Sequence, residues 1–295
     1  MDRRTAIIGT TLVVVSSISF AALPLFAHMA YDDGVTPVSL LFLRFTVAGA
    51  LMMGITHLRG EKLPRGRQLL AFALLGGIGY VGQSYSVFKA LTLADAGLVM
   101  LLLYLYPAIV TLLTGVFGSE PLSGRKILAI AVALIGTGFT VSPRLEGQLL
   151  GIALGLAAAL IYSLYVITGN RLLREAPPIA SSAVIMCSAA VVFGVLAAAN
   201  GVTLPHSLRG WSGVVGVSVV AGVIAVTTFL TGLKLIGPTR ASLFSTVQPV
   251  AAVVLAALFL GERIGPWTAA GGVLIVTAIV VLSYGGSVDT QPDAC

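Results

Sequence analysis

Charged residues are scarce in this sequence. Only 9% of its 295 residues are Asp, Glu, Lys or Arg, whereas 57% are hydrophobic, and the mean hydropathy is +1.03. This composition leaves too little polar surface to cover a water-soluble globule of this length. The basic residues behind the net charge of +6 stand in short loops between apolar runs, which is typical of membrane topology rather than of nucleic-acid binding. We therefore expect the chain to lie in a lipid bilayer.

Side chains that bind metals or form disulfides are also few. The two cysteines, Cys187 in an apolar run and Cys295 at the end, have no spacing typical of a metal site or a disulfide framework. The three histidines, His28, His57 and His206, stand at span ends or in a loop and form no ligand cluster. The sequence therefore predicts no metal and no cofactor.

Motifs for ATP hydrolysis and for catalysis are missing as well. The stretch GSEPLSGRK from Gly118 resembles a phosphate-binding loop, but its glycine spacing is one residue too long and no Ser or Thr follows Lys126. The serines have no histidine or acid at a readable spacing for nucleophilic catalysis. All 11 acidic residues fall in loops, tails or span ends, although a proton or sodium relay normally needs an acid within the membrane. We predict neither an enzyme nor an ATP-driven pump, and favour facilitated transport.

Apolar runs long enough to cross a bilayer recur along the chain. At about 20 residues per crossing, ten helical spans are predicted, at about 5–29, 38–57, 68–90, 96–117, 124–141, 149–170, 179–200, 212–234, 239–260 and 265–284. The amino-terminal run resembles a signal peptide but is longer than about 15 residues, so we interpret it as the first span. With the amino terminus inside, twelve of the 17 Lys and Arg residues lie on the inner side and four on the outer. This bias predicts that both termini are cytoplasmic.

A proline-centred segment occurs twice. Pro107 and Pro249 each lie in an apolar segment, Glu120 and Glu262 follow thirteen residues later, and both landmarks recur after 142 residues. Such repetition indicates a duplicated unit. Because each unit holds five spans, an odd number, the two units enter the membrane in opposite directions, with Glu120 inside and Glu262 outside.

The sequence therefore predicts an all-α membrane protein of ten transmembrane helices, built as two inverted five-helix repeats around a central cavity. We place the first repeat at residues 1–143 and the second at 144–285. The polar residues 286–295 are expected to be a disordered cytoplasmic tail.

Neutral polar and aromatic side chains gather near the middle of the predicted spans. In lipid such groups need partners, so they should face the protein interior. They could bond neighbouring helices, or together form the wall of a cavity for a small polar organic molecule. We assign substrate binding to Ser16, Ser19, Gln83, Tyr85, Tyr106, Tyr162, Tyr165, Thr228, Ser245 and Gln248. Because proline frees a backbone carbonyl within a helix, we assign bending points to Pro24, Pro107 and Pro249.

Two further features concern packing and charge. Gly147, Gly151 and Gly155 recur every four residues in the sixth span and predict close contact with another helix. Arg44 is the one charged residue that lies well inside a predicted span rather than within two residues of its end. It could bind a substrate carboxylate, snorkel to the interface, or bond to carbonyls at a helix end, and we favour a structural role.

Several stretches together resemble a known family. The segments TPVSLLFLRF around Arg44, ALTLADA after Lys89, the proline-centred fourth and ninth spans, and GSEPL with its partner LGERI are similar to the ten-helix EamA-like exporters of the drug/metabolite transporter superfamily. Within that family, the pair Ser84 and Tyr85, the YLYP run ending at Pro107 and the IYSLY run from Ile161 resemble amino-acid exporters of the YddG type.

The resemblance implies a basket of helices around a central cavity lined by the first, third, fourth, sixth, eighth and ninth spans. It implies export of amino acids or related metabolites across the inner membrane of a bacterial cell. In those exporters some of the aromatic positions are tryptophan, whereas Tyr106 and Tyr162 stand here. A broader range of amino acids is therefore expected.

The sequence thus predicts a secondary transporter, as a monomer or homodimer in the bilayer, that exports amino acids or related small metabolites by alternating access. A drug, a sugar phosphate or a nucleotide sugar is an alternative substrate, but a phosphate would need several basic residues in the cavity and only Arg44 is available. An intramembrane enzyme would need clustered acids or histidines, and a channel would need a selectivity-filter loop. Neither pattern is visible in the sequence.

Overall fold

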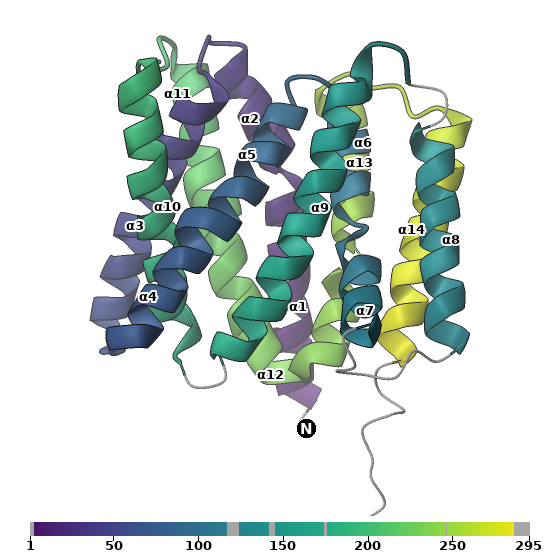
Figure 1. Cartoon of the computed structure of the whole chain (residues 1–295), viewed down its shortest axis with the longest axis horizontal. Coiled ribbons are helices and arrows are strands. Elements are labelled where there is room, and N and C mark those ends of the chain that lie inside the picture. The colour runs from purple at the N-terminus through teal and green to yellow at the C-terminus, as the bar shows by residue number, and fades with distance from the viewer. Residues whose placement is uncertain (1–2, 117–123, 142–144, 174–175, 246, 286–295) are drawn as a thin grey trace, which may run out of the picture.

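The computed structural model describes residues 3–116, 124–141, 145–173, 176–245 and 247–285, and these ranges contain helices and connecting turns but no strand. The first half of the chain (Figure 1) forms α1 (Arg3–Ala21), α2 (Leu23–Tyr31), α3 (Pro37–Leu58), α4 (Gly66–Leu74), the π-helical segment η1 (Leu75–Tyr80), α5 (Val81–Ala90), α6 (Ala96–Leu103), α7 (Tyr106–Val116) and α8 (Gly124–Val141). The second half forms α9 (Leu145–Leu173), α10 (Pro178–Asn200), α11 (Leu208–Val215), the π-helical segment η3 (Gly216–Ile224), α12 (Ala225–Ser245), α13 (Val247–Phe259) and α14 (Pro266–Gly285).

The helices occupy the predicted spans. Five described stretches are long and apolar enough to cross a membrane: Arg3–Tyr31, Pro37–Leu58, Gln148–Gly169, Ile179–Asn200 and Leu208–Phe229. The fourth, fifth, ninth and tenth spans contain shorter apolar helices. One boundary was predicted wrongly, because α12 continues through the expected connection at 235–238 between the eighth and ninth spans.

The two halves run through the molecule in opposite directions. In Figure 1, α1 rises from the amino terminus at the bottom, whereas α9 descends from the top. We call the two ends of the bundle the bottom end and the top end, as they stand in this view. The connection between α13 and α14, which holds Glu262, lies at the top, as the inverted repeat requires. Its predicted counterpart Glu120 lies outside the described residues.

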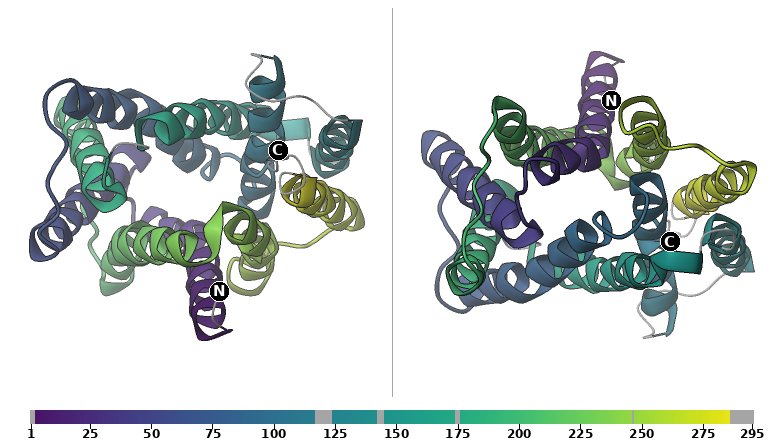
Figure 2. Two further views of the ribbon diagram at one scale, coloured as in Figure 1. Left: turned by 90° about the horizontal axis from the view of Figure 1, so that it is seen from below. Right: turned by 90° about the horizontal axis from the view of Figure 1, so that it is seen from above.

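Helices from the two halves pack against one another in pairs that the repeat relates. The second span, α3, packs on the seventh, α10, and the fifth, α8, packs on the tenth, α14. Figure 2 shows α8 and α14 side by side at one edge of the bundle in both views. Close contacts depend on small residues, since a Cβ on Gly136 of α8 would lie 2.8 Å from the carbonyl oxygen of Gly271 on α14.

The predicted glycine ridge of the sixth span is a packing surface. A Cβ on Gly151 would lie 2.7 Å from the Cβ of Ala94, and one on Gly155 would lie 3.2 Å from the Cβ of Leu102 in α6. Both positions are therefore too close to a neighbour for any larger residue. The side chains around Gly147 lie outside the described residues.

Helix breaks stand beside the predicted bending points. The first span changes from α1 to α2 at Ala22, just before Pro24, and the fourth changes from α6 to α7 at residues 104–105, just before Pro107. Pro249 lies in α13, and residue 246, which precedes this helix, is outside the described residues. The π-helical segments η1 and η3 interrupt the third and eighth spans, which occupy equivalent places in the two repeats. Such interruptions mark places where a membrane helix can bend.

Two acidic residues cap helices at the top end. The Glu262 carboxylate accepts hydrogen bonds from the backbone N–H of Ala96 at 2.5 Å and of Gly97 at 3.0 Å, at the first turn of α6. The Asp33 carboxylate accepts from the backbone N–H of His206 at 2.7 Å and of Ser207 at 2.9 Å, next to the first turn of α11. These bonds satisfy helix-terminal donors and place a negative charge where the helix dipole favours it.

Candidate functional site

A cavity of about 350 Å³ lies within the bundle. Its described wall comes from the first, second, third, fourth, sixth, seventh, eighth and ninth spans. This set includes every span expected from the family resemblance and adds the second and seventh. The volume lies at the lower end of the range for small-molecule sites, about 300–1,000 Å³.

A row of five tyrosines forms the most distinctive part of the wall. The ring of Tyr80 stacks on that of Tyr165 with a centroid distance of 5.3 Å, and Tyr165 stacks on Tyr162 at 5.7 Å. Tyr162 meets Tyr106 edge-on at 4.8 Å, and Tyr106 lies 6.1 Å from Tyr104. All five line the cavity. The row therefore offers aromatic faces and phenol groups to one bound molecule.

The backbone places these rings for identifiable reasons. Tyr162 and Tyr165 stand three residues apart on α9, so they share one face of that helix. Tyr104 and Tyr106 flank the break between α6 and α7, and the Ser163 hydroxyl donates to the Tyr106 carbonyl at 3.1 Å. Tyr80 ends the π-helical segment η1.

Neutral polar groups complete the wall. Ser16, Gln83, Ser84 and Gln248 line the cavity. The Ser16 hydroxyl donates to the Ala225 carbonyl of α12 at 2.7 Å, and the Ser84 hydroxyl donates to the side-chain oxygen of Gln83 at 3.1 Å. Ser16 thus joins two helices, while the amide of Gln83 retains two N–H donors beyond this bond.

Among the described residues, one cation lines the cavity. The Arg44 side chain, 3% exposed, lies with its guanidinium carbon 5.0 Å from the ring centre of Phe45 and 5.2 Å from that of Phe88. Tyr80 and Tyr31 are its other near neighbours. The snorkelling alternative is therefore wrong, because the charge is enclosed by aromatic rings rather than placed at an interface.

The structure brings together six of the ten side chains predicted to bind substrate: Ser16, Gln83, Tyr106, Tyr162, Tyr165 and Gln248. The remaining four are not among the lining residues. Tyr85 is 39% exposed, Ser19 donates to the Val15 carbonyl, and Thr228 donates to the Ile224 carbonyl. Ser245 ends α12 without reaching the wall. Of the bending points, Pro24 and Pro249 are buried, and the side chain of Pro107 lies outside the described residues.

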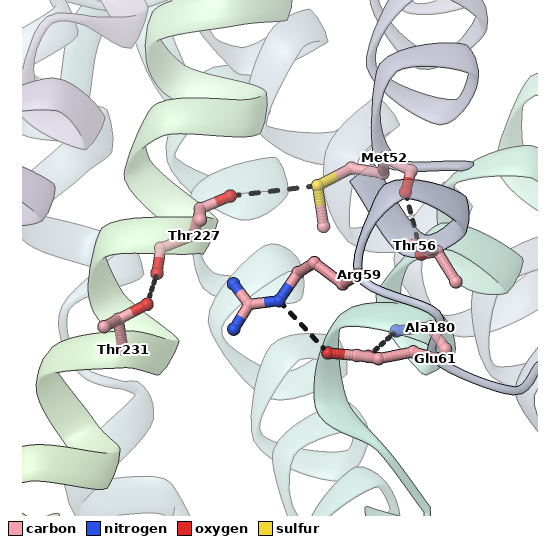
Figure 3. A network of polar contacts seen from close by, with 7 residues as sticks. All are labelled: Met52, Thr56, Arg59, Glu61, Ala180, Thr227 and Thr231. Carbon is pink, nitrogen blue, oxygen red and sulfur yellow. Dashed lines mark hydrogen bonds and ion pairs between the residues drawn. The ribbon is translucent and has the colours of Figure 1, made fainter. Parts of the chain in front are cut away.

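The bottom end of α3 is tied to two other helices (Figure 3). The Thr227 hydroxyl of α12 lies 3.9 Å from the Met52 sulfur of α3. Beyond α3, Arg59 pairs with Glu61 at 3.5 Å, and Glu61 accepts from the backbone N–H of Ala180 in the first turn of α10 at 3.3 Å. These contacts connect the second, seventh and eighth spans.

Comparison with known proteins explains this arrangement. The model of the EamA-like transporter family matches the chain twice, over residues 7–142 and 149–284. The chain belongs to the EamA-like transporter family. Its two matched segments start 142 residues apart, the period at which the prolines and glutamates recur. It is therefore a multi-pass membrane transporter of small molecules and not an enzyme.

Relatives of this EamA-like transporter are named as transporters too. The transporter YcbK of Bacillus subtilis is 26% identical, with 89% of this chain and 88% of YcbK covered. The inner membrane transporter YedA of Escherichia coli K12 is 27% identical, with 84% of this chain and 82% of YedA covered. A solved crystal structure of a protein 22% identical in sequence matches this chain with a TM-score of 0.69. The match covers 99% of this chain and 100% of the other chain, and it shows that the two proteins share a fold.

Some lining residues of this EamA-like transporter had no signal in the sequence. Tyr80, Phe72 and Phe229 line the cavity but stand among many apolar residues in their spans. Gly76, Gly77 and Gly79 precede Tyr80, and the close approach of Gly76 to the backbone of Ile185 on α10 brings η1 to the wall. The glycine-rich sequence that ends at Tyr80 was the feature from which a cavity-lining residue in this span could have been predicted.

Proposed function

We propose that this transporter exports amino acids or related small metabolites across the bacterial inner membrane by facilitated alternating access. The observation that carries the proposal is the cavity of about 350 Å³ walled by five tyrosines, two glutamines and Arg44. A small molecule with a polar head and an apolar or aromatic body matches such a wall. A sugar phosphate matches less well, since Arg44 is the one basic side chain among the described lining residues.

The orientation of the proposed exporter follows from loop charge. Twelve of the 17 Lys and Arg residues are predicted on the inner side, and we therefore assign the bottom end to the cytoplasm together with both termini. The cavity wall extends down to Gly169 and Ser182, each four residues from the bottom end of its helix. At the top, the Tyr31 hydroxyl of α2 donates to the Phe88 carbonyl of α5 at 2.8 Å and joins two sides of the cavity. These features support a state that faces the cytoplasm.

Alternating access requires the two repeats to exchange roles. In an inverted repeat, the conformation of one half resembles that which the other half adopts in the opposite state. The breaks before Pro24 and Pro107 and the π-helical segments η1 and η3 supply bending points near the cavity. We propose that bending there closes the bottom end and opens the top end. No acidic side chain lines the described wall, which favours facilitated transport over proton coupling.

Proteoliposomes test this function. Purified protein should exchange radiolabelled amino acids across the vesicle membrane, and an imposed pH gradient should not accelerate the exchange. Tyr106→Ala and Gln248→Ala should each reduce uptake about tenfold or more, because each removes a group from the cavity wall. Tyr85→Ala, which removes an exposed ring, is the matched control and should leave uptake unchanged. Failure of every amino acid in a panel of twenty to exchange would refute the substrate assignment.

A further inference from the structure

Arg44 is a buried cation without a countercharge. Its side chain is 3% exposed on α3, between the rings of Phe45 and Phe88. Two ion pairs of the described residues, Arg59 with Glu61 and Arg209 with Asp32, lie at or near helix ends and do not involve Arg44. No carboxylate among the described residues neighbours Arg44, and the titratable groups near it are the neutral phenols of Tyr80 and Tyr31. A buried charge is costly in a membrane protein unless something pairs with it.

Structural explanations for this charge do not fit its surroundings. Among the described residues, the hydrogen-bonding neighbour of the Arg44 guanidinium is the neutral phenol of Tyr80, which does not neutralise its charge. Contacts with two aromatic rings lower the cost of the charge but do not neutralise it. The side chain instead lines the cavity, where a transported molecule can reach it.

The chemistry of the wall specifies the partner. The described lining contains Arg44 as its one charged side chain, so this part of the wall carries a net positive charge. A planar guanidinium presents paired N–H donors that match the two oxygens of a carboxylate. From Arg44 the row of tyrosines continues through Tyr80 and Tyr165. A molecule whose carboxylate meets Arg44 can therefore lay its body along those rings.

We propose that Arg44 binds the carboxylate of the transported molecule and thereby restricts the substrates to small monocarboxylates, amino acids included. The proposal rests on the proposed function, because it names the recognition group in the same cavity. The carboxylate is obligatory, whereas an α-ammonium group is not, since no acidic side chain of the described wall pairs with an ammonium. A des-amino acid binds, and an amino-acid amide does not.

The test measures ligand-induced thermal stabilisation of the purified full-length protein. The probes are the twenty amino acids, leucinamide and phenylalaninamide, which lack the carboxylate, and 4-methylpentanoate and 3-phenylpropionate, which lack the amine. Wild-type protein should be stabilised by carboxylate-bearing probes and not by the amides. Arg44→Gln should weaken binding of those carboxylates roughly ten- to a hundred-fold, and Arg44→Lys should recover part of the loss.

Ligand-free stability separates recognition from a structural role. Because Gln removes an unpaired buried charge, Arg44→Gln should keep or raise the melting temperature without ligand. Arg59→Gln, which breaks the exposed pair with Glu61, is the control and should bind the probes as wild type does. A melting temperature lowered by Arg44→Gln, with the carboxylate requirement unchanged, would assign Arg44 to the fold and overturn the proposal.

The remaining outcomes distinguish the two proposals. If amides stabilise the wild-type protein as well as the acids do, or if no carboxylate probe binds, Arg44 does not select a carboxylate. Exchange of amino acids in proteoliposomes would still support the proposed function in that case. If monocarboxylates bind through Arg44 but no amino acid is exchanged, the carboxylate site stands and the amino-acid assignment fails.

Discussion

The hydrogen bond from Tyr31 to Phe88 gives a quantitative test of how the top end stays closed. The Tyr31 hydroxyl of α2 donates to the Phe88 carbonyl of α5 at 2.8 Å, and Phe88 stands in the last turn of α5, where carbonyls lack helical partners. Tyr31→Phe removes the hydroxyl alone and leaves the ring in place. If this bond breaks when the top end opens, the variant should favour opening.

The size of the effect follows from the bond. A neutral hydrogen bond contributes about 1 kcal/mol net. Since about 1.4 kcal/mol corresponds to a tenfold change in an equilibrium constant, the loss should raise the fraction of open molecules about fivefold. No other atom is removed, so the effect should not depend on a cavity left in the core.

Thiol labelling from outside the cell measures that fraction. In a background with Cys187→Ala and Cys295→Ala, Ser84→Cys places one thiol on the cavity wall in α5. A membrane-impermeant maleimide added to intact cells should label this thiol about five times faster when Tyr31→Phe is also present. Tyr85→Phe, which alters an exposed tyrosine, should not change the rate. Equal labelling rates with and without the Tyr31 hydroxyl would refute the reasoning.

Three further predictions concern stability, read as the midpoint of thermal unfolding in detergent. Hydrogen bonds from the backbone N–H of Ser207, and then of His206, hold the pKa of Asp33 below its ordinary value. The contribution of the Asp33 carboxylate to folding stability is therefore fully present above that ordinary value and is lost as pH falls through the lowered pKa. Asp33→Asn should destabilise the protein at pH 7 and remove this loss of stability in acid. Glu262→Gln should cost about 1–3 kcal/mol, because an amide cannot accept both N–H groups of α6 as a carboxylate does, and an unchanged midpoint would show that this cap is dispensable. Gly76→Ala should cost about 1–3 kcal/mol, because its Cβ would meet the backbone of Ile185, whereas Gly54→Ala, with open space around it, should be neutral or stabilising.

Helical periodicity explains which site residues were predictable. Tyr162 and Tyr165 stand three residues apart and share one face, so assigning both to the wall needed only the helix period. Tyr85 stands two residues after Gln83, which turns it about 200° around the helix axis. Since Gln83 lines the cavity, Tyr85 had to point away, and its 39% exposure agrees. Tyr85 was wrongly grouped with the substrate-binding residues because the polar residues of the span were selected without regard to the face of the helix on which each one lies.

The eighth span shows the same effect. Val226 and Phe229, three residues apart, line the cavity, while Thr228 between them turns its hydroxyl back to the Ile224 carbonyl. The hydroxyl of a threonine in a membrane helix can donate a hydrogen bond to a backbone carbonyl of the preceding turn, so polarity alone does not identify a residue of the cavity wall. The π-helical segment η3 ends just before these residues and shifts their rotation in a way that no sequence period describes.

The sequence by itself determined the ten crossings, the 142-residue period and the opposed directions of the two halves, because hydropathy and repetition are properties of the chain read in order. Only the tertiary structure decided that Arg44 faces the cavity without a carboxylate beside it, that Tyr80 extends the row of rings, and that Tyr31 reaches α5. These facts depend on the rotation of each helix about its axis and on distances between helices far apart in the chain, which local patterns do not encode.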